Sequence, residues 1–218
     1  MISNEKIVFL SHTISELSPC YGGKSSIKIE QVKNISKGDT CNTMHWSFSN
    51  HVGTHVDAPL HFIEAGRSVT AIKPKEWFFN KVVLVCISDA GEGHIIGTRD
   101  LGNVEDCDLL LIKTGFEEYR KEEVYWKDSP GLNPEIGSWL KENCPSIKAV
   151  GVDFISISNL NNRDLGREAH DAFLSAGIIL IEDMRLSVLD KTPEQVIVAP
   201  LRVADADGAP CTVYGVCS

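Results

Sequence analysis

The sequence predicts an α/β fold, in a single domain over residues 1–218, with a mixed, partly parallel sheet and flanking helices. Three observations support this prediction. Short apolar runs indicate buried strands, helical patterns separate the later runs, and no linker, repeat or low-complexity tract marks a domain boundary. A chain of 218 residues that is 43% hydrophobic can fill one core, although its length also allows two small ones.

The expected strands come first in a strand-rich N-terminal part and then alternate with helices. They cover residues 7–10, 26–32, 82–87, 109–112, 149–152 and 178–181. The last four runs are almost wholly apolar, which is typical of strands in the interior of a sheet.

Two helices are expected between the last three strands. One covers Pro134 to Asn143, with Asn133 as its cap and proline at its first position. The other covers Leu165 to Ala176, with Asp164 as its cap and Gly177 as its end. Strand, helix and strand in succession predict a parallel arrangement with right-handed crossovers.

A cluster of potential metal ligands lies between residues 49 and 62. Its members are His51, His55, Asp57 and His61. Imidazoles and carboxylates are the usual non-sulfur ligands of zinc. A straight strand would separate the first and last histidines by roughly 33 Å, so one ion can be shared only if the segment bends. Gly53 and Pro59 permit such bends.

Two other interpretations of this segment are possible from its residues. His51 and His55 are four residues apart, as in zinc-protease helices, but the glycine, proline and β-branched residues around them disfavour a helix. The segment could also be a histidine-rich surface loop. Metal binding is the favoured interpretation because four potential ligands occur together.

The string His51-x-Gly53-Thr54-His55-x-Asp57-x-Pro59-x-His61 resembles the signature of the metal-dependent cyclase-like hydrolases. That family includes bacterial kynurenine formamidases, also called arylformamidases, and isatin hydrolases. Later segments resemble family blocks in the expected order, at residues 110–115, 130–132, 150–153 and 170–182. The resemblance covers nearly the whole chain and implies a swivelling β/β/α fold.

The resemblance also implies roles for individual residues. The metal ligands it implies are His51, His55, Asp57, His170 and Glu182. They would hold one or two Zn²⁺ ions, and Mn²⁺ accepts the same ligands. His61 matches the proton-transferring histidine, and Tyr21 stands where the formamidases carry a substrate-contacting tryptophan. Two further departures are Lys113, where an arginine is expected, and Ser158, where many relatives carry an aspartate.

The positions of the later residues fit this scheme to different degrees. Glu182 follows an apolar strand, at the edge where α/β sheets bind ligands. His170 lies within a predicted helix, and only the resemblance singles it out. Asp153 also ends a strand, where it either orients an imidazole or serves as a turn residue.

These residues predict a hydrolase, and the resemblance implies that it cleaves a small amide, at carbon–nitrogen bonds other than peptide bonds. Metal binding lowers the pKa of water from about 15.7 toward 7. Hydroxide would then attack a polarised carbonyl, and His61 would carry a proton to the leaving amine. The expected substrates are an aryl formamide such as N-formylkynurenine or a cyclic amide such as isatin. The alternatives are lactone or ester hydrolysis, a cyclase reaction, and a non-catalytic protein that binds metal or a small molecule.

Composition limits the partners. The net charge of −9 argues against nucleic acid and against anionic membrane surfaces. No apolar stretch is long enough for a membrane span, the N-terminus does not resemble a signal peptide, and seven scattered cysteines suggest reduced thiols. We therefore expect a cytoplasmic protein with a small-molecule substrate, and the resemblance implies a homodimer or homotetramer.

Overall fold

A mixed sheet of nine strands forms the centre of the molecule. The computed structural model describes residues 6–23 and 27–217. In the order in which they pair, the strands are β5 (Phe78–Phe79), β12 (Gln195–Pro200), β13 (Gly208–Cys217), β4 (His55–Asp57), β11 (Ile179–Glu182), β10 (Ala149–Val152), β8 (Leu109–Lys113) and β6 (Val82–Cys86), and β1 (Lys6–Phe9) also pairs with β13.

The sheet combines both strand directions. Strands β6, β8, β10 and β11 are parallel, whereas β4, β13, β12, β5 and β1 join antiparallel to their neighbours. The sheet is nearly closed and barrel-like. The predicted α/β class with a mixed, partly parallel sheet is therefore confirmed, while the swivelling arrangement stays a prediction.

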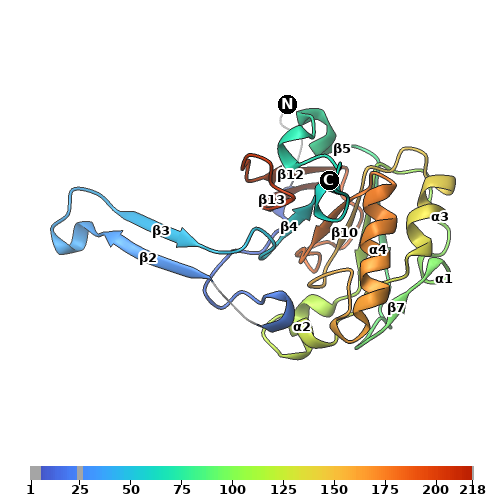
Figure 1. Cartoon of the computed structure of the whole chain (residues 1–218), viewed down its shortest axis with the longest axis horizontal. Coiled ribbons are helices and arrows are strands. Elements are labelled where there is room, and N and C mark those ends of the chain that lie inside the picture. The colour runs from blue at the N-terminus through green and yellow to red at the C-terminus, as the bar shows by residue number, and fades with distance from the viewer. Residues whose placement is uncertain (1–5, 24–26, 218) are drawn as a thin grey trace.

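Two helices pack beside the parallel strands, α3 (Glu135–Asn143) and α4 (Arg163–Ser175) (Figure 1). Two others, α1 (Thr98–Leu101) and α2 (Val124–Lys127), are single turns, and β7 (Ile95–Ile96) and β9 (Gly131–Leu132) form a small parallel ladder.

Alternate residues of the parallel strands face two different cores. The core that also contains residues of α3 and α4 includes Leu110, Ile112, Val150, Val152 and Leu180. The opposite core includes Leu109, Leu111, Ala149, Ile179 and Ile181. Successive side chains of a strand point to opposite faces, so burial of both faces requires the continuous apolar runs seen in the sequence.

The predicted helices are observed with small differences at their starts. The Asn133 side chain accepts a hydrogen bond from the backbone of Glu135, as expected of a cap at the start of α3. The prediction that Asp164 caps the next helix is wrong, because α4 begins at Arg163. A 3-10 turn at Leu160–Asn162 directly precedes α4, so the chain is already helical before Asp164. Gly177 takes a φ of 72° just after α4, as its predicted role requires.

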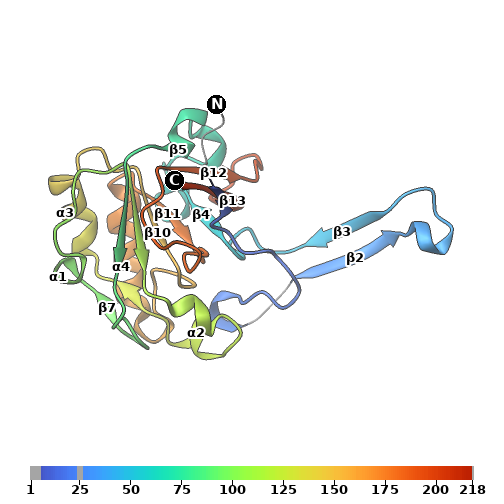
Figure 2. The same ribbon diagram turned by 180° about the vertical axis from the view of Figure 1, so that it is seen from behind.

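Strands β2 (Lys28–Lys33) and β3 (Thr43–Ser47) pair into an antiparallel arm that projects from the body (Figures 1 and 2). The predicted strand at residues 26–32 corresponds to β2, except that residue 26 lies outside the described residues. In the described parts of the chain, no helix has the length and apolar character needed to cross a membrane.

Candidate metal centre

The motif segment bends as its composition predicts. Gly53 takes a φ of 60°, β4 follows at His55–Asp57, and a 3-10 turn forms at Pro59–His61. Strand β4 lies between β11 and β13 and pairs antiparallel with both. In the register with β11, His55 lies opposite Glu182. The sheet thereby brings together two candidate ligands that are distant in sequence.

Two imidazoles and two carboxylates converge at this point, and all four side chains are buried. His55 Nε2 lies 3.5 Å from Asp57 Oδ1 and 3.4 Å from Glu182 Oε2. His170 Nε2 lies 3.5 Å from Asp57 Oδ2 and 3.5 Å from Glu182 Oε1. Tetrahedral zinc with bonds of about 2.0–2.1 Å separates neighbouring ligand atoms by about 3.3 Å. The four donors are thus spaced like ligands that share a cation.

His51 extends the cluster on one side. Its Nδ1 lies 2.8 Å from Asp57 Oδ1. His51, His55 and Asp57 form one group of potential ligands, and Asp57, His170 and Glu182 form another. Asp57 is common to both groups, which is the arrangement needed if two ions share one carboxylate.

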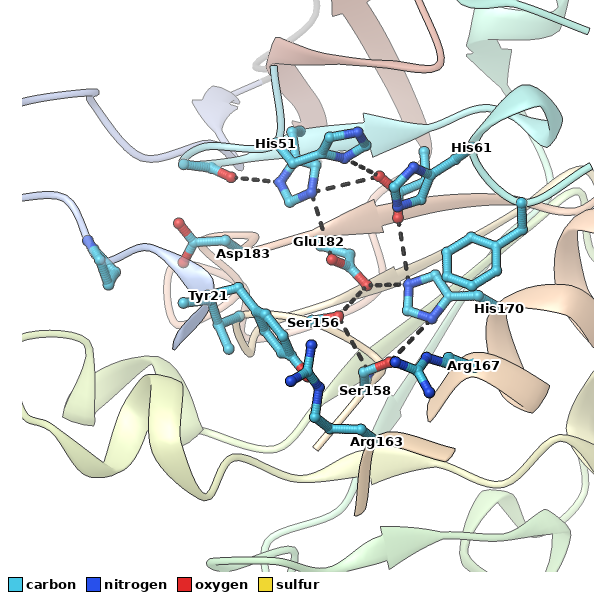
Figure 3. Close-up of a pocket in the computed structure, with 16 residues that line it drawn as sticks. Tyr21, His51, His61, Ser156, Ser158, Arg163, Arg167, His170, Glu182 and Asp183 are labelled. Carbon is cyan, nitrogen blue, oxygen red and sulfur yellow. Dashed lines mark hydrogen bonds and ion pairs between the residues drawn. The ribbon is translucent and has the colours of Figure 1, made fainter. Parts of the chain in front are cut away.

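Backbone carbonyls fix the orientation of the two buried imidazoles. Figure 3 shows His170 beside Glu182 and Ser158. His55 Nδ1 donates to the Gly53 carbonyl at 2.8 Å, and His170 Nδ1 donates to the Gly166 carbonyl at 2.8 Å. The Ser158 hydroxyl also lies 3.1 Å from His170 Nδ1. With its proton on Nδ1, each ring presents the Nε2 lone pair to the carboxylates, as a metal-binding histidine does.

Glu182 is held from behind by the segment after β10. Its Oε1 accepts hydrogen bonds from the Ile157 backbone at 2.7 Å and from the Ser156 hydroxyl at 3.1 Å. The next residue, Asp183, is buried and has a φ of 52°, which is rare outside glycine. The Arg120 guanidinium donates to both Asp183 carboxylate oxygens, at 2.8 and 2.7 Å, and thereby holds this unusual backbone.

The electrostatics of the four buried groups favour positive charge between them. Burial alone would lower the pKa of each imidazole, but contacts with Glu182 and Asp57 outweigh it and raise the pKa of His55 to about 9 and that of His170 to about 10. Burial opposes ionisation of Asp57 and Glu182, yet contacts with the imidazoles lower the pKa of both. Two buried carboxylates this close stay ionised only beside positive charge, which protons or a metal ion can supply.

His61 lies beside the four buried groups, in a third group of potential ligands with His51 and Asp207. Its Nδ1 is 2.8 Å from Asp207 Oδ2, and its ring stacks on that of His51 at 4.1 Å between centroids. Asp207 Oδ2 is also 2.8 Å from His51 Nε2, and Asp207 Oδ1 accepts from the Asn50 amide at 2.7 Å. Asp207 was not predicted from the sequence, where it is one acidic residue among several. Only the pairing of β13 with β4 brings it next to His51 and His61.

Tyr21 lines the same cavity, which has a volume of about 290 Å³. The side chain is 38% exposed and lies in the 3-10 turn Tyr21–Gly23. A Cβ added to Gly23 would lie 2.6 Å from ring atoms of Trp126, so this turn packs closely against α2. The structure therefore brings all seven predicted site residues to one cavity or its edge.

Of three other residues that the sequence singles out, Ser158 lies beside the cluster, whereas Asp153 and Lys113 do not contact it. Asp153 contacts no imidazole. It accepts hydrogen bonds from the backbone of Thr114 and Gly115, so the turn interpretation is correct. Lys113 Nζ donates to the Leu189 carbonyl. Ser158 contacts His170, so this departure from the family pattern lies directly beside the cluster.

Part of the chain matches a known protein family. The Cyclase family model, described as "Putative cyclase", matches residues 8–159, and the chain belongs to this family. The matched segment contains the whole histidine motif but ends before His170 and Glu182.

Individual relatives extend the similarity along the chain. A kynurenine formamidase of Bacillus cereus is 31% identical over 166 residues, which cover 75% of each chain. A kynurenine formamidase from another strain of that species is 27% identical over 203 residues, which cover 92% of each chain. Isatin hydrolase A from Labrenzia aggregata, solved with benzyl benzoate, superposes with a TM-score of 0.84 at 23% identity, over 98% of this chain and 94% of that one. At that identity the superposition establishes a shared fold.

Proposed function

We propose that this chain, as one domain over residues 1–218, is a metal-dependent hydrolase that cleaves the carbon–nitrogen bond of a small amide. The substrate class is an aryl formamide such as N-formylkynurenine or a cyclic amide such as isatin. The observation that carries the proposal is the convergence of two Nε2 atoms on two buried carboxylates, at 3.4–3.5 Å. The kynurenine formamidases similar to this chain support the choice of substrate.

The donor set fits a divalent cation of the zinc type, and Mn²⁺ accepts the same donors. The residues that would hold one or two ions are His51, His55, Asp57, His170 and Glu182. A cation bound there would polarise a carbonyl group and make water a better nucleophile at neutral pH. The preoriented imidazoles support this role, because their Nδ1 protons are already held by backbone carbonyls.

The protein itself supplies proton transfer and positioning. Asp207 contacts Nδ1 of His61, which leaves Nε2 of His61 free to face the substrate. That nitrogen would accept a proton from water and donate the proton to the leaving amine. Phe62 and Ile155 give the cavity an apolar part of its wall, against which an aryl or aliphatic part of the substrate would pack. Tyr21 offers an aromatic face and a hydroxyl at the edge of the same cavity.

Turnover of N-formylkynurenine tests the proposal. The purified protein is stripped with a chelator and then reloaded separately with Zn²⁺ and Mn²⁺. The proposal predicts that activity vanishes with the metal and returns with one of the two ions. Turnover of lactones or esters alone would show that the protein is a lactone or ester hydrolase and not an amidase. Metal uptake without turnover of any amide, lactone or ester would contradict an enzymatic role.

A second copy of this chain is the macromolecular partner that we propose, in a homodimer or a tetramer built from dimers. Ile29, Met44, Trp46 and Phe48 of the arm line one side of a groove of about 930 Å³, and Phe9 and Leu201 of the body line the other. Both sides are apolar, and each copy offers the same arm and the same groove. A two-fold pairing in which each arm fills the other groove would cover both surfaces.

Sedimentation velocity tests this pairing. Trp46→Glu should yield a monomer, whereas Ser47→Glu on the opposite face of β3 should stay dimeric beside Lys28, its partner in the strand pair. A monomeric parent protein would contradict the pairing.

The free state of all seven cysteines supports a reducing, cytoplasmic compartment.

A further inference from the structure

Two arginines border the cavity on the helix that carries His170. Arg163 and Arg167 are four residues apart on α4, so they lie on one face of the helix, and His170 follows within a turn of Arg167. All three side chains line the cavity. Figure 3 shows both guanidinium groups near Tyr21 and Ser158, on the side away from His51 and His61. The helix thus places two cations at the opening and a candidate metal ligand further in.

Neither arginine has a buried partner. Arg167 pairs with Asp164 at 2.9 Å, but the Asp164 side chain is 91% exposed, and an exposed pair of this kind contributes little. Arg163 forms no ion pair with the residues that the structure describes. Arg120, by contrast, is held at both ends by the buried Asp183 carboxylate. Arg120 therefore stabilises a buried carboxylate, whereas Arg163 and Arg167 have no buried carboxylate to stabilise.

The charges of Arg163 and Arg167 act inside the cavity. Burial raises the pKa of Tyr21, and both arginines oppose that rise, so their charge reaches the tyrosine hydroxyl. The chain as a whole carries a net charge of −9. Two cations without a buried partner, at the opening of one cavity, are local exceptions to this charge. Guanidinium groups match the planar geometry of a carboxylate.

We propose that Arg163 and Arg167 bind a carboxylate of the substrate while its amide lies at the candidate metal centre. This inference rests on the proposed function and narrows it to amides that carry an anionic group. Neutral cyclic amides become poorer substrates, because they leave both guanidinium groups without a partner. Tyr21 lies close to Arg163 (Figure 3), where its ring would pack against the part of the substrate that joins carboxylate and amide.

A matched set of substrates tests the inference with the metal-loaded protein. Formanilide is the neutral compound, and its 2-, 3- and 4-carboxylates are the anionic ones. Arg163→Gln and Arg167→Gln should each raise KM for the best carboxylate about tenfold, the loss expected for one charge-assisted contact of about 1.4 kcal/mol. For formanilide, KM and kcat should stay within about twofold. Arg99→Gln removes the same charge from α1, outside the cavity, and serves as the control.

Binding of benzoate and benzamide, measured by calorimetry, separates this inference from the proposed function. The parent protein should bind benzoate more tightly than benzamide, and the double variant should lose that preference while Arg99→Gln keeps it. Equal losses for neutral and anionic compounds, or an unchanged preference in the double variant, would overturn the inference. If neither formanilide nor any of its carboxylates is turned over, aryl formamides fail as substrates, and the benzoate preference still decides the role of the arginines.

Discussion

Asp207 Oδ2 lies 2.8 Å from His61 Nδ1, although 146 positions separate the two residues. The same oxygen lies 2.8 Å from His51 Nε2, so one carboxylate contacts the expected proton shuttle and an expected metal ligand. Burial alone would raise the pKa of Asp207, but hydrogen bonds with His51 and His61 outweigh it and lower the pKa. Asp207 is therefore an anion that fixes which nitrogen of His61 remains available.

Asp207→Asn should lower kcat about 10–100-fold while metal content stays close to that of the parent, the effect expected when an orienting partner is lost. An asparagine can still contact one histidine, but it no longer carries the charge that both contacts share. Steady-state kinetics combined with elemental analysis measures the effect. Unchanged kcat in a metal-loaded variant would show that the contact is incidental.

His61→Ala should keep its metal and lose turnover, because His61 contributes no donor atom to the buried cluster of His55, Asp57, His170 and Glu182. His55→Ala and Asp57→Ala should instead lose metal, since each removes a donor from the buried cluster. Elemental analysis after gel filtration distinguishes the two outcomes. A fully loaded Asp57→Ala protein would refute the assignment of this carboxylate, which belongs to two of the three groups of potential ligands.

Asp153→Asn should change the pH dependence of stability. Burial raises the pKa of Asp153 to about 6 despite hydrogen bonds from Thr114 and Gly115. Between its ordinary value of 3.8 and about 6, the folded protein binds the extra proton, so this group's contribution to stability is fully present below pH 3.8 and is lost as the pH rises through 6. The difference corresponds to about 3 kcal/mol.

The asparagine variant stays neutral at every pH. Its free energy of unfolding, relative to the parent, should therefore rise by up to about 3 kcal/mol between pH 4 and pH 8. Urea unfolding at both pH values measures this change, and the constant cost of an altered hydrogen bond cancels in the comparison. A relative stability that is the same at both pH values would show that folding does not raise the pKa of Asp153.

Arg120→Met should destabilise the fold by about 3–5 kcal/mol, because it leaves the buried Asp183 carboxylate without its cation. The adjoining Glu182 should shift as well, so metal affinity should fall. Arg67→Met is the control, since Arg67 pairs with Glu76 near the surface and should cost at most about 1 kcal/mol. Urea unfolding of both variants tests the difference, and equal losses would contradict a special role for Arg120.

The sequence predicted those features that depend on local pattern. Continuous apolar runs located the parallel strands because both faces of those strands are buried. Gly53 and Pro59 located the bends that bring the motif histidines together. Gly177 located the end of α4 because its left-handed backbone suits glycine.

Features that depend on contacts between residues distant in sequence could not be predicted from local sequence patterns. His170 was singled out by resemblance alone, since nothing in its helix distinguishes it from other half-polar positions. Asp207 carried no signal at all, and its role depends on the pairing of β13 with β4. Asp164 was chosen as a helix cap from its position, but the preceding 3-10 turn had already started the helical path.

A crystal structure of the zinc-loaded protein, with anomalous data collected on both sides of the zinc absorption edge, would locate the bound ion. We expect an anomalous peak within about 2.0–2.2 Å of His170 Nε2 and of oxygens of Asp57 and Glu182. A second peak beside His51 would indicate two ions. A filled site elsewhere, or loaded protein without a peak among these residues, would contradict the metal centre from which the proposed chemistry follows.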